Sequence, residues 1–180
     1  MPNQIITPKN QAFQTLAELD KPVKDYFFCL KEIQALHNAV IYFIGKETNQ
    51  HFKNATKTVH STLYGSVQIL NLWLAQLDKQ TDAISDFAEI DNPTSLIHAI
   101  YNDFQKLDVD VQHLMNLAKM ACDELLQTNP KTFQIAGIEL GVIQFMTDAI
   151  KRMTTQLHSD IFAECDVLGE LYPTIFKAGV

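Results

Sequence analysis

The 180-residue chain has little of what β-rich and nucleic-acid-binding proteins need. It contains only 6 Gly and 6 Pro, which is few for the many turns of an all-β fold. Its 14 basic residues are outnumbered by 21 acidic ones, and the formal net charge of -7 disfavours nucleic acid and anionic lipid as partners. Hydrophobic residues make up 47% of the chain, which is enough for the core of one folded domain.

Cysteine is scarce, and long hydrophobic runs are absent. Cys29, Cys122 and Cys165 are an odd number and widely spaced, which fits neither a disulfide framework nor a zinc site. The longest apolar run, residues 39–44, is far shorter than the roughly 20 residues of a membrane span. The first residues carry no basic segment followed by an apolar run. We therefore expect a cytoplasmic protein with reduced, mostly buried thiols and no transmembrane segment.

The sequence also lacks the usual catalytic motifs. It has no glycine-rich nucleotide loop and no Gly-x-Ser-x-Gly elbow. None of its six histidines follows a glutamate by three residues, as in di-iron bundles, and the nearest pair is Asp110 with His113. His158 with Glu164 and Cys165 would still need a fourth metal ligand from another helix. We expect no enzyme, metal or cofactor, and a helical enzyme or metal protein is the least favoured alternative.

Proline and glycine divide the chain into helical blocks with no strand-like alternation between them. The segment Asp20-Lys21-Pro22 is typical of a helix start. The clearest break is at Asn92, which can cap a helix, followed by Pro93 at the first helical position. The chain thus reads as one all-α domain. Its predicted helices are 10–19, 22–44, 46–90, 93–128 and 130–168, followed by a short apolar tail, 169–180.

Two of these blocks carry long heptad seams of apolar residues. The first seam is Leu63, Val67, Leu70, Leu74, Leu77, Thr81, Ile84 and Ala88. The second is Ile97, Ile100, Phe104, Leu107, Val111, Leu114, Ala118, Ala121 and Leu125. Because a short turn joins the two blocks, they should form a long antiparallel hairpin. Two helices cannot bury such stripes alone, so we predict a four-helix bundle or a coiled-coil-like assembly.

The segment 67–77 is apolar almost all round. Leu72 lies opposite the Leu63, Leu70 and Leu77 seam, so this helix should be covered on two sides. The second cover is either the helix's own bundle or a partner or apolar surface, and the sequence leaves both open. The candidate contact residues are Ile69, Leu72, Trp73, Leu74 and Leu77, with Phe104 and Leu107 on the facing helix.

Residues 46–128 resemble a phasin, a protein that coats polyhydroxyalkanoate storage granules. The resemblance lies in a long polar-apolar helix, a short proline-containing link and a Leu/Gln/Phe-rich start to the next helix. These features correspond to Glu47–Gln50 through Leu77–Gln80, then Asp91–Pro93, then Leu96–Gln105 continuing to Leu117–Ala121. It implies a non-catalytic protein that binds the apolar granule surface through amphipathic helices. We further expect a homo-oligomer.

Charge is compatible with such a coat, because like-charged outer faces keep coated particles apart. Residues 46–91 hold 4 basic and 6 acidic residues, and residues 92–128 hold 2 and 5, so the hairpin contributes 6 minus 11, or -5. The alternative function is a compact four-helix-bundle adaptor or regulatory module that binds a protein partner. The aromatic residues and the continuous core fit both functions.

Overall fold

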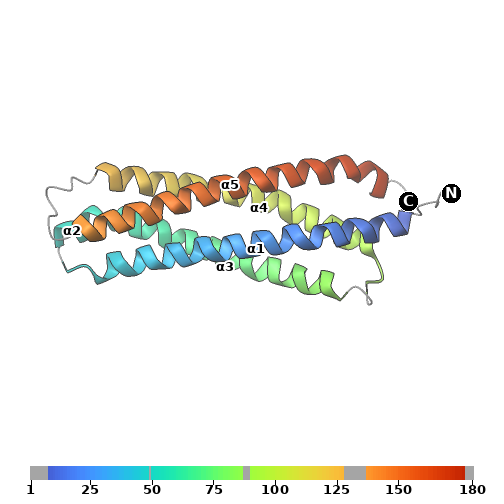
Figure 1. Ribbon diagram of the computed structural model, residues 1–180, viewed down its shortest axis with the longest axis horizontal. Helices are drawn as coiled ribbons and strands as arrows, with labels where there is room; N and C mark the ends of the chain where they lie inside the picture. Colours follow the sequence, from blue (N-terminus) through green and yellow to red (C-terminus); the bar gives the residue numbers. More distant parts are fainter. Residues whose placement is uncertain (1–7, 49, 87–89, 128–136, 177–180) are drawn as a thin grey trace.

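The computed structural model is a bundle of four long antiparallel helices, viewed along its side in Figure 1. It describes residues 8–48, 50–86, 90–127 and 137–176. The helices are α1 Pro8–Lys46, the short α2 Gln50–Ala55, α3 Lys57–Ser85, α4 Pro93–Gln127 and α5 Gly137–Phe176. They run up and down in chain order, so that α1 begins and α5 ends at the same end of the bundle. The predicted all-α bundle is confirmed.

Each long helix packs against two main neighbours, in the cyclic order α1, α3, α4, α5. The contacts are most extensive between α4 and α5 and between α1 and α3. The predicted hairpin partners α3 and α4 also pack together, but over a smaller interface. Among the described residues, no helix has both the length and the hydropathy that a membrane span requires.

Helix α4 follows its predicted pattern closely. All nine residues of its heptad seam are buried in the core. At its start, the side-chain oxygen of Asn92 accepts a hydrogen bond of 3.0 Å from the backbone N–H of Ser95, and Pro93 takes the first helical position. Such a cap satisfies one of the backbone N–H groups that a helix start leaves unpaired.

Helix α3 buries a seam that differs from the prediction in one of its two rows. Leu63, Leu70, Leu77 and Ile84 are buried as expected. The other buried row is Ser66, Trp73 and Gln80, whereas the predicted row of Val67, Leu74 and Thr81 is only half-buried. Hydrophobicity favoured Val67 and Leu74, but Trp73 and Gln80 turn inward because they donate hydrogen bonds to carboxylates of α4. A buried polar side chain is tolerated when it is paired in this way.

The predicted break before Pro22 is wrong, because α1 passes through this residue without ending. An internal proline costs about 3 kcal/mol through the lost N–H donor and the steric clash it introduces. Leu19 and Val23 are buried on either side of it, and burying each such side chain contributes about 1.5–3 kcal/mol. An ion pair of 2.7 Å between Lys24 and Asp20 also spans the proline. The common core therefore keeps the two predicted helices, 10–19 and 22–44, continuous.

The single predicted helix 46–90 is also wrong: the structure has two helices, separated at Thr56. Thr56 is fully buried, and its hydroxyl donates to the carbonyl oxygen of Phe52 at 2.8 Å. Phe52 is buried as well. Backbone hydrogen bonds of 2.9 Å from Thr56 to Phe52 and from His60 to Thr56 link α2 to α3 through Thr56. Helix α3 ends at Ser85, and residues 87–89 lie outside the described part.

The last helix is longer at its C-terminal end than predicted. Residues 130–136 lie outside the described part, and α5 then runs from Gly137 to Phe176 instead of ending at 168. The predicted tail 169–180 is thus helical as far as Phe176, and residues 177–180 are not described. Leu168 is buried and Leu171 packs on the core. Gly169 lies within this helix, and a Cβ there would make an ordinary van der Waals contact of 3.4 Å with the hydroxyl of Tyr101 on α4.

Candidate functional site

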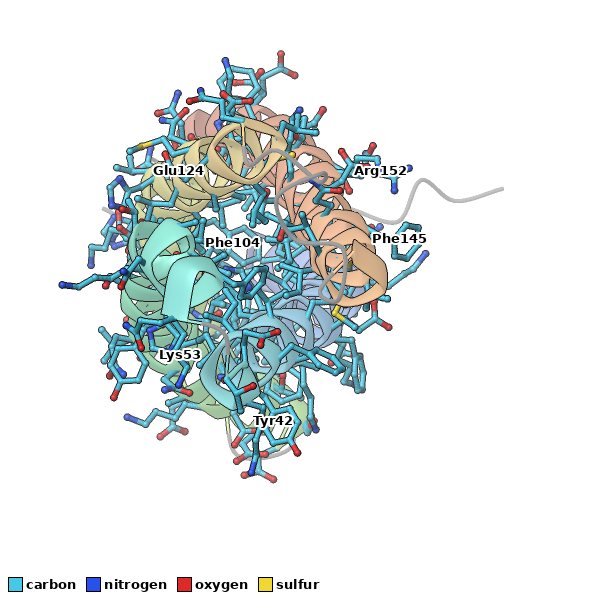
Figure 2. All side chains as sticks on the ribbon, turned by 90° about the vertical axis from the view of Figure 1, so that its left-hand side faces the viewer. Tyr42, Lys53, Phe104, Glu124, Phe145 and Arg152 are labelled. Atoms are coloured by element: carbon cyan, nitrogen blue, oxygen red, sulfur yellow. The ribbon has the colours of Figure 1, made fainter. Side chains whose placement is uncertain are left out.

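The seven predicted contact residues do not form one surface. Trp73, Leu77, Phe104 and Leu107 lie in the core, and Ile69 and Leu74 are half-buried against it. Figure 2 shows Phe104 between the helices, whereas Tyr42 and Phe145 point away from the bundle. Leu72 alone of the seven is exposed, at 74%. Of the two covers that the sequence left open for this side of α3, its own bundle is therefore wrong, because α3 packs mainly on α1 and α4 and the Leu72 side faces solvent. Cover by a partner or an apolar surface stays a prediction.

Charged hydrogen bonds hold α3 against α4 at the predicted contact region. The indole N–H of Trp73 donates to Asp110 at 2.7 Å. Further along, the side-chain amides of Gln76 and Gln80 both donate to one oxygen of Asp103, at 2.7 and 2.6 Å. Hydrogen bonds to ionised groups are shorter and stronger than neutral ones. These contacts tie the two helices in one register, so the buried members of the predicted set act in the structure of the bundle.

A partly apolar groove lies between the first and last helices, α1 and α5. It has a volume of about 490 Å³. Pro22 and Cys29 of α1 form one side of its floor, and Met153, Leu157 and Ala163 of α5 form the other. Proline, cysteine and alanine are short side chains, so the two helices leave space between them here. Another hollow, of about 660 Å³ between α3 and α4, is lined mainly by polar side chains.

The apolar row on α1 extends beyond this hollow. Pro22, Cys29, Leu36 and Phe43 recur every seven residues and therefore lie along one face of the helix. Leu36 is half-buried against the core, and Phe43 is partly exposed. On α5, Val167 lines the other end of the groove and is 53% exposed. Of the α1 row, Pro22 and Cys29 line the groove beside α5, and Leu36 and Phe43 continue the row further along α1.

Acidic side chains form the rim of the groove. Asp25 of α1 and Asp160 and Glu164 of α5 line it, with Lys21 as the one basic group among the lining residues. Burial raises the pKa of Glu164 above its ordinary value, and the carboxylate of Glu18 raises it further. The C-terminal half of α5, residues 157–176, contains four acidic residues and neither Lys nor Arg. The rim therefore carries an excess of two negative charges, three carboxylates against one ammonium.

A tyrosine beneath the groove joins its two walls. The hydroxyl of Tyr26 donates to the backbone carbonyl of Asp160 at 3.1 Å, and its ring meets that of Phe104 edge-on, with centroids 5.3 Å apart. Burial, followed by the negative charge of Glu164, raises the pKa of Tyr26 above its ordinary value. Tyr26 consequently stays a neutral hydrogen-bond donor and connects the groove directly to the core.

None of the three thiols is activated for nucleophilic chemistry. Burial raises the pKa of Cys29 to about 11, with Glu32 and Asp160 adding to the shift. Burial also raises the pKa of Cys165 to about 11, with Asp108 as the next contributor. For Cys122 burial raises the pKa despite the opposing charge of Lys151. Since the thiolate is the reactive form, none is an activated nucleophile at neutral pH. The prediction that the thiols are mostly buried is confirmed for Cys122, whereas Cys29 and Cys165 are half-buried.

The histidine sets considered as metal ligands are dispersed. His113 is exposed on α4. His158 lies 3.5 Å from Asp108 of α4 instead of forming a set with Glu164 and Cys165. Within residues 8–48, 50–86, 90–127 and 137–176, no three His, Cys, Asp or Glu side chains are placed to hold one metal ion.

His37 of α1 is fully buried in the core of the bundle. The Nδ1 of His37 lies 2.8 Å from the carbonyl oxygen of Ile33, so Nδ1 carries the hydrogen and donates. Its other ring nitrogen, Nε2, has no hydrogen-bond partner among the described residues. Burial lowers the pKa of His37 below 6.5, although the hydrogen bond to Ile33 opposes the shift. A neutral imidazole in the core leaves one nitrogen unpaired, but an imidazolium there would be disfavoured far more strongly.

The bundle should therefore lose stability in mild acid. Below about pH 6.5 the unfolded chain takes up a proton that folded His37 does not, so the free energy of unfolding should fall by up to about 1.4 kcal/mol per pH unit until the folded pKa is reached. Urea unfolding between pH 5 and 8 measures this. The raised pKa of Glu164 acts in the opposite direction, so the native chain is compared with His37→Leu. That variant should have the flatter profile, and His113→Leu should keep the native one. Equal slopes for all three would contradict the assignment.

The α1/α5 groove lies outside residues 46–128, the segment in which the sequence placed the candidate contact residues. The signal was present in the seven-residue recurrence of Pro22, Cys29, Leu36 and Phe43. The assumed helix start at Pro22 obscured that row, since it placed Pro22 at a terminus. Nothing in the sequence indicated that α5 would be the neighbour of this face.

Comparison with known proteins identifies no relative of the chain. No protein-family model, no curated protein and no solved structure matches the chain.

Proposed function

We propose that the chain is a non-catalytic helical bundle that binds a protein partner in the groove between α1 and α5. The observation that carries this proposal is an apolar floor open to solvent beneath an acidic rim. Ligand and partner sites combine apolar contact area with a few polar groups that fix orientation. The thiols have raised pKa values, and the described histidines are not grouped with other metal ligands, so neither supports a reaction at the groove.

The closed bundle favours binding at its surface over binding by its core. Side-chain hydrogen bonds join each of three pairs of neighbouring helices: Gln34 to Asn71 at 2.6 Å, Trp73 to Asp110 at 2.7 Å, and Gln144 to the carbonyl of Leu125 at 3.1 Å. Opening the bundle would break these contacts and expose the buried seams. A groove already formed on the surface needs no such rearrangement, which supports the adaptor or regulatory function over one that requires unfolding.

Site-specific photo-crosslinking tests the proposal in the cell that produces the protein. A photoreactive amino acid replaces Val167 in the groove or, as a control, Met120 of α4; both side chains are more than half exposed. We expect a discrete cross-linked product with another protein from position 167 and none from position 120. Absence of a product at 167, or the same products at both positions, would contradict a specific partner in the groove.

A second candidate function is the coating of polyhydroxyalkanoate granules, possible without opening the bundle. It is supported by large apolar side chains exposed on each of the four long helices: Phe28, Leu72, Val109 and Phe145. Contact of one side of the bundle with an apolar surface would remove the exposed apolar side chains of that side from water, at about 25 cal/mol for each Å² buried. A homo-oligomer that covers Leu72 is the matching proposal for self-association.

Leu72→Glu separates surface binding from folding. Because Leu72 is 74% exposed, the substitution should change the free energy of unfolding by less than about 0.5 kcal/mol and leave the helix content unchanged. If the chain coats granules or self-associates through this side, co-flotation with granules or the oligomer should be lost. Gln68→Glu adds the same charge at another exposed position of α3 and should retain both. Unfolding of Leu72→Glu would show that this side is packed, contrary to the structure.

A further inference from the structure

The α1/α5 groove has a shape suited to an elongated partner. The residues of α5 that line the groove run from Met153 to Val167, which is 14 residue steps, or roughly 21 Å of helix at 1.5 Å each. This length matches about 14 residues of a partner helix lying along the groove. An amphipathic helix with apolar residues spaced three and four apart places them on one such strip. The partner helix would then lie between α1 and α5, the first and last helices of the bundle.

The charge of the rim selects among possible occupants. Three carboxylates, Asp25, Asp160 and Glu164, line the groove against the single ammonium of Lys21. Another copy of the chain, docked groove to groove, would bring two such acidic rims together, and each copy has a net charge of -7. Like charges juxtaposed across an interface oppose association. A partner with basic residues beside its apolar face would instead pair with the rim.

We propose that the groove between α1 and α5 binds a basic amphipathic helix of another protein. This inference rests on the proposed protein-binding function and specifies its partner. The apolar face of the helix lies on Pro22, Cys29 and Met153, and its lysines or arginines lie beside Asp160 and Glu164. Burial of the apolar face supplies affinity, whereas the charges set specificity and orientation.

Binding of two matched synthetic peptides tests the inference with the purified full-length chain. Both peptides have about 20 residues and the same leucine face, and the residues beside that face are lysine in one and glutamate in the other. Fluorescence anisotropy should show the lysine peptide binding at least roughly tenfold more tightly, and added NaCl should weaken that binding. Equal binding of the two peptides, or of neither, would overturn the inference.

Variants of the chain locate the binding. Asp160→Lys/Glu164→Lys should weaken the lysine peptide roughly tenfold or more and improve the glutamate peptide. Asp78→Lys/Asp82→Lys makes the same charge change on exposed positions of α3 and should leave both affinities unchanged. Ala163→Trp fills the groove without changing charge and should weaken the lysine peptide too. Circular dichroism and thermal melting of each variant show whether it is folded. Equal losses in the groove and α3 charge variants would mean non-specific attraction and contradict the site.

Two other occupants give different results. If a small polyamine is the ligand, spermine should compete with the lysine peptide at micromolar concentration, which would contradict a helical partner. If a second copy fills the groove, sedimentation should show an oligomer that Ala163→Trp dissociates, which would also contradict it. Failure of both peptides together with a cross-link from position 167 would reject the basic helix but retain the protein-binding function. Absence of that cross-link would reject the function itself.

Discussion

Phe104→Ala should lower the free energy of unfolding by about 3–5 kcal/mol, the range found when a buried aromatic side chain is truncated to alanine. Phe104 is among the largest fully buried side chains of the bundle. Its ring meets that of Tyr26 edge-on at 5.3 Å, and this aromatic contact is lost together with the packing. Because the helices cannot close completely around the space left, a cavity adds to the lost transfer energy. Chemical denaturation, followed by circular dichroism, measures the change.

Phe145→Ala is the matched control, since it removes the same side chain from a position that is 69% exposed. It should change the stability by no more than about 0.5 kcal/mol. Phe104→Ala should also loosen the wall of the α1/α5 groove, because Tyr26 packs on Phe104 and bonds to Asp160. Similar losses for the two variants would mean that Phe104 does not occupy the core as described.

Asp103→Leu should lower the free energy of unfolding by about 2–4 kcal/mol. One oxygen of Asp103 accepts hydrogen bonds from Gln76 and Gln80, and Lys106 lies 3.7 Å from the other. Gln80 is buried, and its own side-chain oxygen already has no hydrogen-bond partner among the described residues. Leucine at 103 would leave the amide of Gln80 unpaired as well, at the desolvation cost of a buried donor. Thermal and urea unfolding measure the loss.

A double-mutant cycle distinguishes this network from a simple packing effect. Replacing Gln80 by leucine together with Asp103→Leu removes the stranded amide, so the pair should lose less stability than the two single variants added together. Asp103→Asn keeps an acceptor oxygen and should cost less than Asp103→Leu. Strict additivity of the two leucine variants would show that the hydrogen bonds from Gln80 to Asp103 contribute nothing.

Both predictions bear on the choice between the proposed functions. A granule coat that used Trp73, Leu77, Phe104 and Leu107 would have to separate the helices that these residues hold together. The aromatic contact at Phe104 and the hydrogen bonds at Asp103 both oppose that separation. Binding in the α1/α5 groove, or at the exposed Leu72, leaves both intact.

The amino-acid sequence by itself determined the class of the fold and most of α4. The nine apolar positions of its seam are spaced so that one face of a helix, and only one, can be buried. Asn92 and Pro93 determined where this helix starts, because a capping side chain and a proline at the first turn act locally. Local pattern and final packing agree in this segment, so no knowledge of the neighbouring helices was needed.

Only the tertiary structure decided that helices continue through Pro22 and Gly169 and that two helices are separated at Thr56. It also decided which side chains of α3 turn inward. A proline or glycine has a fixed local cost, but whether the helix continues depends on how much burial the neighbouring helices offer on both sides. Trp73 and Gln80 are buried because α4 presents carboxylates at their level, and the order of residues in α3 cannot reveal that. The α1/α5 groove likewise exists because the first and last helices become neighbours. Pairings between residues more than a hundred positions apart, such as Tyr26 with Asp160, arise only when the bundle closes.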